Sequence, residues 1–318
     1  MSTIPIIDIE KAATSTASPV VADEIRRACT DVGFLQIVGH NVDPTLLNRV
    51  YEVADDLVAL PTDEKTRMRS PSGHPFRGWT AYSGEFATNI IERLQVCNVE
   101  DEAAAAATGI DEQWRDFFQP NIWPTQVPGF KDAVRACFEA TRELGATVMS
   151  LFASALELDE DYFTPMLSVD TSNFAINVYR GAVTSSASEP TVIIPEHTDS
   201  GTLTLLHQRG DYDGLQVRLR TGERVTVPVI DEAFVINIGD LMARWTNDRW
   251  VSTPHRVIAP PNPGEGRVSL TTFYLPAIDT VIEPLPSCVS DDEPARYGPV
   301  TPYEWEAEFL SRSYRKAG

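Results

Sequence analysis

Two short stretches of the chain hold three side chains that are good ligands for metal ions. His197 and Asp199 stand two residues apart within residues 193–201, and His255 follows within residues 254–257. Alternate side chains of an extended strand point to the same side, so the imidazole of His197 and the carboxylate of Asp199 are expected to converge. If His255 joins them from a neighbouring strand, two neutral nitrogens and one carboxylate oxygen occupy one face of an octahedron. That set suits non-haem Fe(II) and leaves other positions open.

A second pair of side chains has the chemistry to hold a carboxylate. Arg267 and Ser269 alternate within the β-prone run 266–274, so they are expected on one face of a strand. A guanidinium can bind a carboxylate through two parallel hydrogen bonds, and the serine hydroxyl can add a third. The pair therefore fits the far end of a small dicarboxylate. The alternative is an arginine on an edge strand that simply faces water.

The order and spacing of these residues resemble the iron- and 2-oxoglutarate-dependent dioxygenase superfamily, in the branch that includes isopenicillin N synthase and many plant and microbial oxygenases. The stretches that carry the resemblance in the second half of the chain are 197–199, 237–240, 245–247, 255–257 and 267–269. In the first half they are 4–8, 33–40 and 77–79. The likeness therefore covers nearly the whole chain.

The resemblance implies a catalytic Fe(II) held by His197, Asp199 and His255. It implies that 2-oxoglutarate binds the iron through its 1-carboxylate and keto oxygen, while its other carboxylate rests on Arg267 and Ser269. Dioxygen is then the second co-substrate, and 2-oxoglutarate becomes succinate and CO2 as a small-molecule substrate is oxidised. Hydroxylation is the expected outcome, with desaturation or ring closure as variants. Biosynthesis of specialised metabolites is the expected setting.

Four further residues are candidates for the co-substrate and substrate sites. Tyr179 alternates with Asn177, a position that lies near the co-substrate in the family; the phenol can donate to a second oxo-acid oxygen, or it can be a cross-strand aromatic. Phe273 can wall the substrate site or belong to the core. Arg93 can meet a substrate carboxylate or form a surface salt bridge. The sequence does not indicate which small molecule is the substrate.

The remaining histidines compete for the role of metal ligand. His207 is the strongest rival, but no carboxylate stands two residues from it, and its neighbours are typical of ordinary strand packing. His40 and His74 lie in the first half of the chain, far from the expected barrel strands. Asp240 belongs to a turn in this interpretation and is not expected to be a ligand.

Three other functions stay open on the residues alone. The first is an Fe(II) oxidase of the isopenicillin N synthase type, which uses no 2-oxoglutarate and turns its Arg-x-Ser pair to a substrate carboxylate or another acid. The second is a Zn(II) hydrolase in which the same three ligands activate water, although no His-Glu-x-x-His helix is present. The third is a jelly-roll binding protein without catalysis, which would have no need of three open-faced metal ligands.

Composition narrows the partners and the compartment. The 318 residues carry a net charge of −20, which repels phosphate backbones and anionic membrane surfaces, so no nucleic acid or membrane partner is expected. Four cysteines lie far apart and are typical of reduced, packed thiols. No apolar run reaches the length of a membrane helix, and no leader pattern opens the chain, so a cytoplasmic protein is expected. The oligomeric state is left open.

The hydrophobic periodicity divides the chain into a helical part and a strand-rich part. Apolar residues recur at helical spacing in 21–32, 44–60 and 130–158, and the last of these predicts one long helix packed on a sheet. After residue 171 the period changes to two, which is typical of an antiparallel sandwich or barrel. The strands expected are 34–38, 174–179, 192–197, 203–208, 215–219, 224–227, 234–238, 257–258 and 268–274.

The expected fold is mainly β with α, an α+β arrangement in which the resemblance implies a double-stranded β-helix, or jelly roll, with helices packed on one outer face. One catalytic unit is expected over residues 1–318. It comprises an N-terminal region of mixed α/β at 1–120, the jelly-roll core at 171–280 and a closing C-terminal helix at 301–314.

Two segments between these parts have less regular sequences. Residues 70–84 are rich in turn formers and are expected to form a loop over the mouth of the barrel, where they are candidates for contact with substrate. The acidic and alanine-rich residues 99–112 are expected to form a short surface helix or a mobile insertion, and no chemistry is assigned to them.

Overall fold

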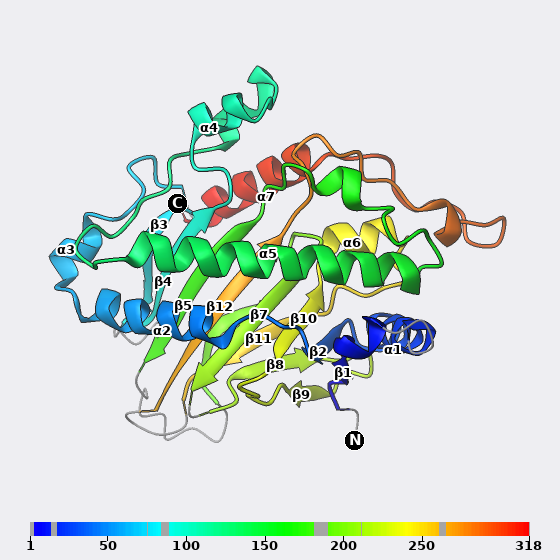
Figure 1. Ribbon diagram of the computed structural model, residues 1–318, viewed down its shortest axis with the longest axis horizontal. Coiled ribbons are helices and arrows are strands. Elements are labelled where there is room, and N and C mark those ends of the chain that lie inside the picture. Colours follow the sequence, from blue (N-terminus) through cyan, green and yellow to red (C-terminus); the bar gives the residue numbers. More distant parts are fainter. Residues whose placement is uncertain are drawn as a thin grey trace.

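The structure is a computed structural model that describes residues 3–13, 18–74, 76–83, 89–180, 190–210, 212–260 and 265–317. Two β-sheets and a layer of helices make up this part of the chain (Figure 1). The helices are α1 (Ser18–Asp31), α2 (Pro44–Ala59), α3 (Thr62–Thr66), α4 (Glu102–Ala107), α5 (Phe130–Ala155), α6 (Asp240–Trp245) and α7 (Pro302–Ala317). Short 3-10 helices are η1 (Ile9–Ala13), η2 (Glu112–Phe117), η3 (Thr164–Leu167) and η4 (Pro286–Cys288).

The two sheets differ in size. The larger sheet has eight strands, in the spatial order β1 (Ile6–Asp8), β2 (Phe34–Val38), β10 (Phe234–Ile238), β7 (Leu203–Gly210), β12 (Gly266–Tyr274), β5 (Asn173–Arg180), β4 (Asn89–Cys97) and β3 (Gly78–Ser83). The smaller sheet has four, in the order β6 (Val192–His197), β11 (His255–Ile258), β8 (Leu215–Arg218) and β9 (Arg224–Thr226). Among these strands β1 and β2 pair in parallel, and the other pairs are antiparallel.

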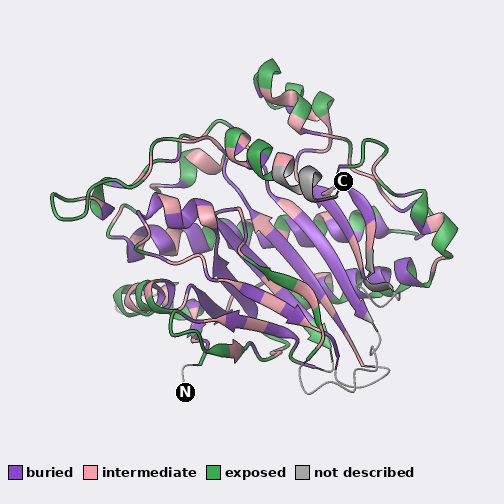
Figure 2. Ribbon diagram, turned by 180° about the vertical axis from the view of Figure 1, so that it is seen from behind, coloured by how far each residue is buried: buried purple, intermediate pink, exposed green. Residues whose placement is uncertain are grey.

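The long helix α5 crosses the outer face of the larger sheet, with α2 and α1 beside it (Figure 1). Its buried side chains recur at steps of three and four, as in Val134, Cys137 and Thr141, so one stripe of the helix faces the sheet. Phe138 meets Phe174 of β5 with ring centroids 5.4 Å apart. Seen from behind, the strands of the larger sheet are mainly buried (Figure 2). The helices thus cover one face and leave the other for the site.

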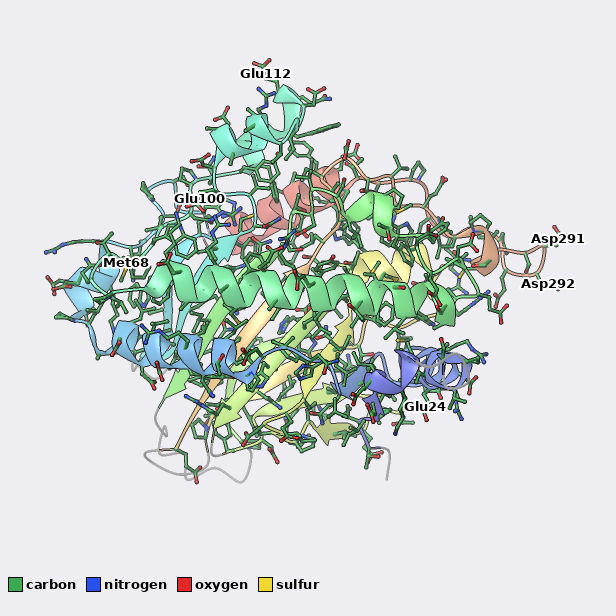
Figure 3. The ribbon with its side chains drawn as sticks, viewed as in Figure 1. Glu24, Met68, Glu100, Glu112, Asp291 and Asp292 are labelled. Atoms are coloured by element: carbon green, nitrogen blue, oxygen red, sulfur yellow. The ribbon has the colours of Figure 1, made fainter. Side chains whose placement is uncertain are left out.

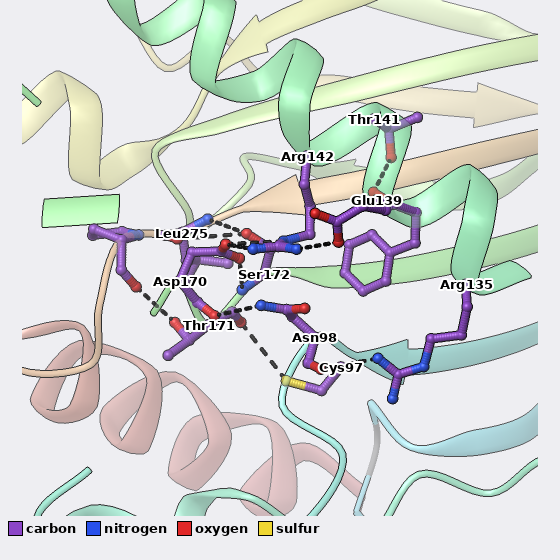
Figure 4. Close-up of polar contacts among 12 residues, drawn as sticks. Cys97, Asn98, Arg135, Glu139, Thr141, Arg142, Asp170, Thr171, Ser172 and Leu275 are labelled. Atoms are coloured by element: carbon purple, nitrogen blue, oxygen red, sulfur yellow. Dashed lines mark hydrogen bonds and ion pairs between the residues drawn. The ribbon is translucent and has the colours of Figure 1, made fainter. Parts of the chain in front are cut away.

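A polar cluster fixes α5 against the sheet (Figure 4). Arg142 donates through Nε to Asp170 Oδ2 at 2.9 Å, and Asp170 Oδ1 accepts from the backbone N–H of Ser172 at 3.1 Å. The hydroxyls of Thr141 and Thr272 lie 2.7 Å apart and join the helix to β12. Salt screens an ion pair less when it is partly buried, so this cluster is well suited to hold the helix in place above β5 and β12.

The inner face of the larger sheet turns toward the smaller sheet. A hydrophobic cluster fills part of the space between them and anchors the two sheets to each other by burial of apolar surface. Its buried members from the larger sheet include Phe34, Ile91, Tyr179 and Val235, and those from the smaller sheet include Leu215, Val217 and Val257. The expected α+β fold, a jelly-roll core with helices on one outer face, is confirmed.

The sequence prediction for residues 70–84 was wrong in its second half. Residues 78–83 form β3, which pairs with β4, while residues 84–88 lie outside the described part of the chain. The turn formers end before Gly78, and β-prone residues such as Trp79 and Thr80 follow. Strand β4 was not predicted, because Glu92 and Arg93 interrupt its apolar pattern. Residues 102–107 form the short helix α4, one of the two alternatives expected there.

Many acidic side chains lie at the surface. Glu24, Glu112, Asp291 and Asp292 are exposed and point away from the body of the protein (Figure 3). Ionised carboxylates stay in water unless they are paired, so this distribution is the low-energy one. Among the described helices, none is both long enough and apolar enough to cross a membrane.

Substitution of Gly145 by alanine should destabilise the protein. A Cβ atom at Gly145 in α5 would lie 2.7 Å from Cδ2 and Cε2 of the Tyr274 ring, which is buried in β12. The alanine gains helix propensity, but the ring has to move within a packed core, and the overpacking should cost about 1–3 kcal/mol of unfolding free energy. Urea denaturation measures the difference. Thr147→Ala, on the exposed side of the same helix, should change stability by less than about 0.5 kcal/mol, and equal effects of both variants would contradict this packing.

Candidate active site

The three side chains predicted to bind a metal ion meet between the two sheets. One ligand atom each from His197, Asp199 and His255 lies within 4.8 Å of the other two. Nε2 of His197 and Nε2 of His255 are each 3.7 Å from Asp199 Oδ1. His197 ends β6 and His255 begins β11, and the two residues are paired in the antiparallel register of these strands. A single ion placed between these atoms would meet two imidazole nitrogens and one carboxylate oxygen.

The route by which Asp199 reaches this point differs from the expected one. The strand ends at His197, so strand alternation does not bring the two side chains together; Asp199 lies in the turn that follows. Its Oδ2 atom accepts hydrogen bonds from Thr204 Oγ1 at 2.6 Å and from Asn237 Nδ2 at 2.8 Å. These donors belong to β7 and β10 of the larger sheet. They fix Oδ2 and leave Oδ1 directed at the two imidazoles.

Backbone carbonyls orient both histidine rings. Nδ1 of His197 lies 2.8 Å from the carbonyl oxygen of Pro195, and Nδ1 of His255 lies 3.1 Å from that of Thr253. A carbonyl only accepts, so each Nδ1 carries the proton and each Nε2 keeps its lone pair. The protein thereby selects the tautomer that places both lone pairs next to Asp199. This use of the second ring nitrogen is usual at metal sites.

The protonation states also suit a cation. Burial raises the pKa of Asp199, but attraction to His255 and His197 and the two hydrogen bonds to Oδ2 outweigh burial, so its pKa lies below the ordinary value. Burial is the largest influence on His255 and lowers its pKa, although the carboxylate of Asp199 opposes this. An ionised carboxylate beside a neutral imidazole is the state that binds a metal ion.

A cavity extends from the metal-binding residues along the inner face of the larger sheet to Arg267. The guanidinium is buried; Nε and Nη2 donate to Gln208 Oε1 at 3.1 and 2.8 Å, and the group lies 4.9 Å from the centroid of the Tyr179 ring. Its Nη1 has no hydrogen-bond partner within the described part of the chain. A buried cationic donor left unpaired is costly, so the cavity fits an anionic ligand at this end.

The predicted co-substrate residues form two neighbouring cross-strand pairs on the inner face of the larger sheet. Register places Tyr179 opposite Arg267 and Asn177 opposite Ser269. Asn177 Nδ2 donates to Ser269 Oγ at 3.2 Å, and Asn177 Oδ1 accepts from Arg93 Nε at 2.6 Å. Tyr179 stacks against the guanidinium by its ring. The structure thus brings all four predicted residues together, with Arg93 beside them.

Comparison with known proteins points to the same iron and 2-oxoglutarate chemistry. A family model described as the N-terminal region of the non-haem dioxygenase in morphine synthesis matches residues 4–126, and the 2OG-Fe(II) oxygenase superfamily model matches residues 166–276. The proline hydroxylase buaE of Petromyces alliaceus is 28% identical over 90% of this chain and 91% of its own length. Flavanone 3-dioxygenase 2 of Oryza sativa subsp. japonica is 29% identical over 98% and 84%. A Neurospora crassa protein whose crystal structure holds alpha-KG and thymine is 25% identical, with a TM-score of 0.84 over 98% of this chain and 97% of that one.

The chain belongs to the Fe(II)- and 2-oxoglutarate-dependent oxygenase superfamily. The protein is therefore a non-haem dioxygenase, and the expected use of Fe(II) and 2-oxoglutarate is confirmed. The donor set described above fits both groups. The neutral nitrogens and the carboxylate suit Fe(II), and the unpaired Nη1 of Arg267 suits a carboxylate of the co-substrate.

A second cavity of this oxygenase opens beside His197 and Asp199. It has a volume of about 140 Å³, and the two predicted substrate contacts, Phe273 and Arg93, both line it. Gln95 and Glu306 line it as well and were not predicted. Burial raises the pKa of Glu306 to about 7, although a hydrogen bond with Ser200 opposes the rise. The substrate role of these residues remains a prediction.

Several site residues were missed because their signals are weak in the sequence. Thr204 and Asn237 are polar residues inside apolar strands, a sign of a buried hydrogen-bond partner. Gln208 is identified only by the register of β7 against β12. The rival ligand His207 points to the opposite face of β7, where its Nδ1 lies 2.6 Å from the hydroxyl of Tyr51. Asp240 accepts from Thr198 Oγ1 at 3.2 Å and is not among the three metal-binding residues.

Removal of one hydrogen bond to Asp199 should weaken metal binding. Thr204→Val keeps the shape of the side chain but deletes the donor to Oδ2, so the carboxylate is held less firmly, and the affinity for Fe(II) or Mn(II) should fall about 10- to 100-fold. Anaerobic titration with either ion measures the change. Thr80→Val is the matched control, because the Thr80 hydroxyl has no partner within the described chain. A native affinity in Thr204→Val would show that Asn237 alone suffices.

Proposed function

We propose that His197, Asp199 and His255 hold Fe(II) in this oxygenase, and that 2-oxoglutarate lies along the cavity that ends at Arg267. The observation that carries the proposal is the buried, unpaired Nη1 of Arg267 in a cavity that also reaches all three metal-binding residues. Only an anion that spans this cavity satisfies both ends. A dicarboxylate with a keto oxygen has a chelating group for iron and a distal carboxylate for the guanidinium.

Several residues position the groups that are proposed to hold the co-substrate. Gln208 accepts from two guanidinium nitrogens of Arg267, and the third, Nη1, is left without a partner in the described chain. The ring of Tyr179 supports the guanidinium from one side. Asn177 is hydrogen-bonded to both Ser269 and Arg93, so it connects the proposed co-substrate residues to the second cavity. These contacts restrict the guanidinium before any ligand arrives, so less freedom is lost on binding.

Bound Fe(II) supplies the activation of dioxygen, which couples conversion of 2-oxoglutarate to succinate and CO2 with oxidation of the substrate. Each turnover consumes one O2: one oxygen atom enters succinate, and for hydroxylation the other enters a C–H bond of the substrate. Residues around the second cavity hold the substrate next to the metal. Phe273 and Arg93 are proposed substrate contacts, since both line that cavity and neither binds the metal.

The substrate is proposed to be a small molecule of specialised metabolism. The similar proteins carry names that refer to proline, homoarginine and flavanone, and the Neurospora crassa protein was crystallised with thymine, all of them small molecules. Hydroxylation is the proposed outcome, with desaturation or cyclisation as variants set by substrate placement. The chain is proposed to act as one catalytic unit in the cytoplasm, with residues 171–280 as its iron-binding core, residues 1–120 as its N-terminal region and residues 301–314 as a closing helix.

The co-substrate site can be tested by anaerobic difference absorbance. Addition of Fe(II) and then 2-oxoglutarate to metal-free protein should produce a charge-transfer band in the visible region. Arg267→Ala removes charge-assisted hydrogen bonds to the distal carboxylate, so the 2-oxoglutarate concentration for half-saturation should rise about 10- to 100-fold. Arg209→Ala is the matched control, since Arg209 is exposed and lies over the ring of Tyr51 rather than along the cavity.

The outcomes separate the alternatives. Bound Fe(II) without a band would indicate an oxidase of the isopenicillin N synthase type. Tight binding of Zn(II) without iron chemistry would indicate a hydrolase. A band with equal half-saturation in the wild type and Arg267→Ala would place the distal carboxylate elsewhere.

A further inference from the structure

The C-terminal helix α7 reaches the turn that holds Asp199. Trp305 Nε1 donates to the backbone oxygen of Ser200 at 3.0 Å, and Ser200 Oγ donates to Glu306 Oε1 at 2.8 Å. The helix is thus hydrogen-bonded to both the backbone and the side chain of Ser200. Glu306 and the next turn of the helix, at Phe309, line the second cavity.

Glu306 is a buried carboxyl group with unused capacity for hydrogen bonds. Only 7% of the residue is exposed, and the hydroxyl of Ser200 is its one hydrogen-bond donor in the described chain. A carboxylate can accept several hydrogen bonds, so at least one position remains for a ligand. No cationic side chain forms an ion pair with Glu306 in the part of the chain that the structure describes. A carboxyl group buried in this way is stabilised by a donor that arrives with the substrate.

Gln95 provides a second unsatisfied polar group in the same cavity. It lies on β4, two residues from Arg93, and is 3% exposed. Its Oε1 atom has no hydrogen-bond partner in the described chain. Register places the small residue Ala175 beside it on β5, so no large neighbouring side chain fills the space next to the amide. Buried amides are normally paired, and an unpaired one in a cavity is typical of a ligand contact.

Aromatic rings form part of the remaining wall, and Arg93 and Asn173 line the cavity as well. Phe76 and Phe309 are stacked, with ring centroids 5.9 Å apart and an interplanar angle of 22°, and Phe273 faces the cavity from β12. The cavity therefore combines flat apolar walls with two hydrogen-bond acceptors. A pure hydrocarbon would leave Gln95 Oε1 unpaired and Glu306 with the hydroxyl of Ser200 as its one donor in the described chain, and an ionised acid group directed at the Glu306 carboxylate would meet a like charge. A donor on the substrate satisfies both.

We propose that Glu306 and Gln95 are the specificity-determining residues for the substrate, and that they select a compact small molecule that presents N–H donors. The proposal rests on the oxygenase function given above and names the substrate class of that site. The N–H can belong to an amine or to an amide. Binding of a charged amine depends mainly on the carboxylate of Glu306. Binding of a neutral amide depends mainly on the side-chain amide of Gln95.

Anaerobic calorimetric titration of the protein loaded with Fe(II) and 2-oxoglutarate tests this selection. The probes are two matched pairs that differ in the N–H: pipecolate against cyclohexanecarboxylate, and glutarimide against N-methylglutarimide. The N–H member of at least one pair should bind 10-fold or more tightly than its partner. Glu306→Gln should abolish the preference for pipecolate over cyclohexanecarboxylate. Gln95→Leu should abolish the preference for glutarimide over N-methylglutarimide. Glu308→Gln, an exposed glutamate of the same helix, should keep the wild-type preference.

The controls keep the two proposals apart. Gln95→Leu replaces a buried amide whose Oε1 atom has no partner in the described chain by an apolar group of similar size, so its melting temperature should equal or exceed that of the wild type. If the charge-transfer band forms but neither pair shows a preference, or the preference survives in both variants, the proposed selection by Glu306 and Gln95 is wrong while the oxygenase function stands. If the band itself fails to form, the oxygenase function is the part that fails.

Discussion

The hydrogen bonds that Thr204 and Asn237 donate to Asp199 are the interactions on which the site depends. The donors come from the larger sheet, whereas the two histidines belong to the smaller sheet. A buried carboxylate left without donors would be expelled or neutralised, and the turn that carries it would lose its fixed shape. The same two contacts therefore keep the ligand ionised, direct its free oxygen and join the sheets at the metal-binding point.

The two cavities around this point have different chemistry. One ends in a buried cation, Arg267, which is oriented by Gln208 and has one nitrogen free. The other is lined by acceptors and aromatic rings, and it is closed in part by α7. Charge at Arg267 favours an acid in the first cavity, and the acceptors Glu306 and Gln95 favour a donor-bearing molecule in the second. Arg93 lines both cavities and is bonded to Asn177, so the two sites share one side chain.

Local sequence patterns predicted which residues meet at the candidate metal and co-substrate sites, because short spacings and strand alternation decide which residue types can converge. The prediction that His197 and Asp199 lie close together is correct, but the reason given for it is wrong. Strand alternation was expected to bring them together, whereas Asp199 lies in the turn after the end of the strand. Gln95 and Glu306 could not be found in this way, because their meeting depends on how β4 and α7 pack around a cavity. Strand β4 was missed because its charged residues are paired only in three dimensions, Glu92 with Lys65 and Arg93 with Asn177.

The position of β12 in the larger sheet has a consequence for folding. It lies between β7 and β5, both of which precede it in the chain by many residues. Until residues 266–274 have been synthesised, the sheet consists of two pieces, each with an unpaired inner edge. Closure thus waits for contacts that are distant in sequence, which slows folding and leaves strand edges open to aggregation in the meantime. The strand that completes the sheet also carries Arg267, the residue proposed to hold the co-substrate, so that proposal implies that the sheet closes before the co-substrate can bind.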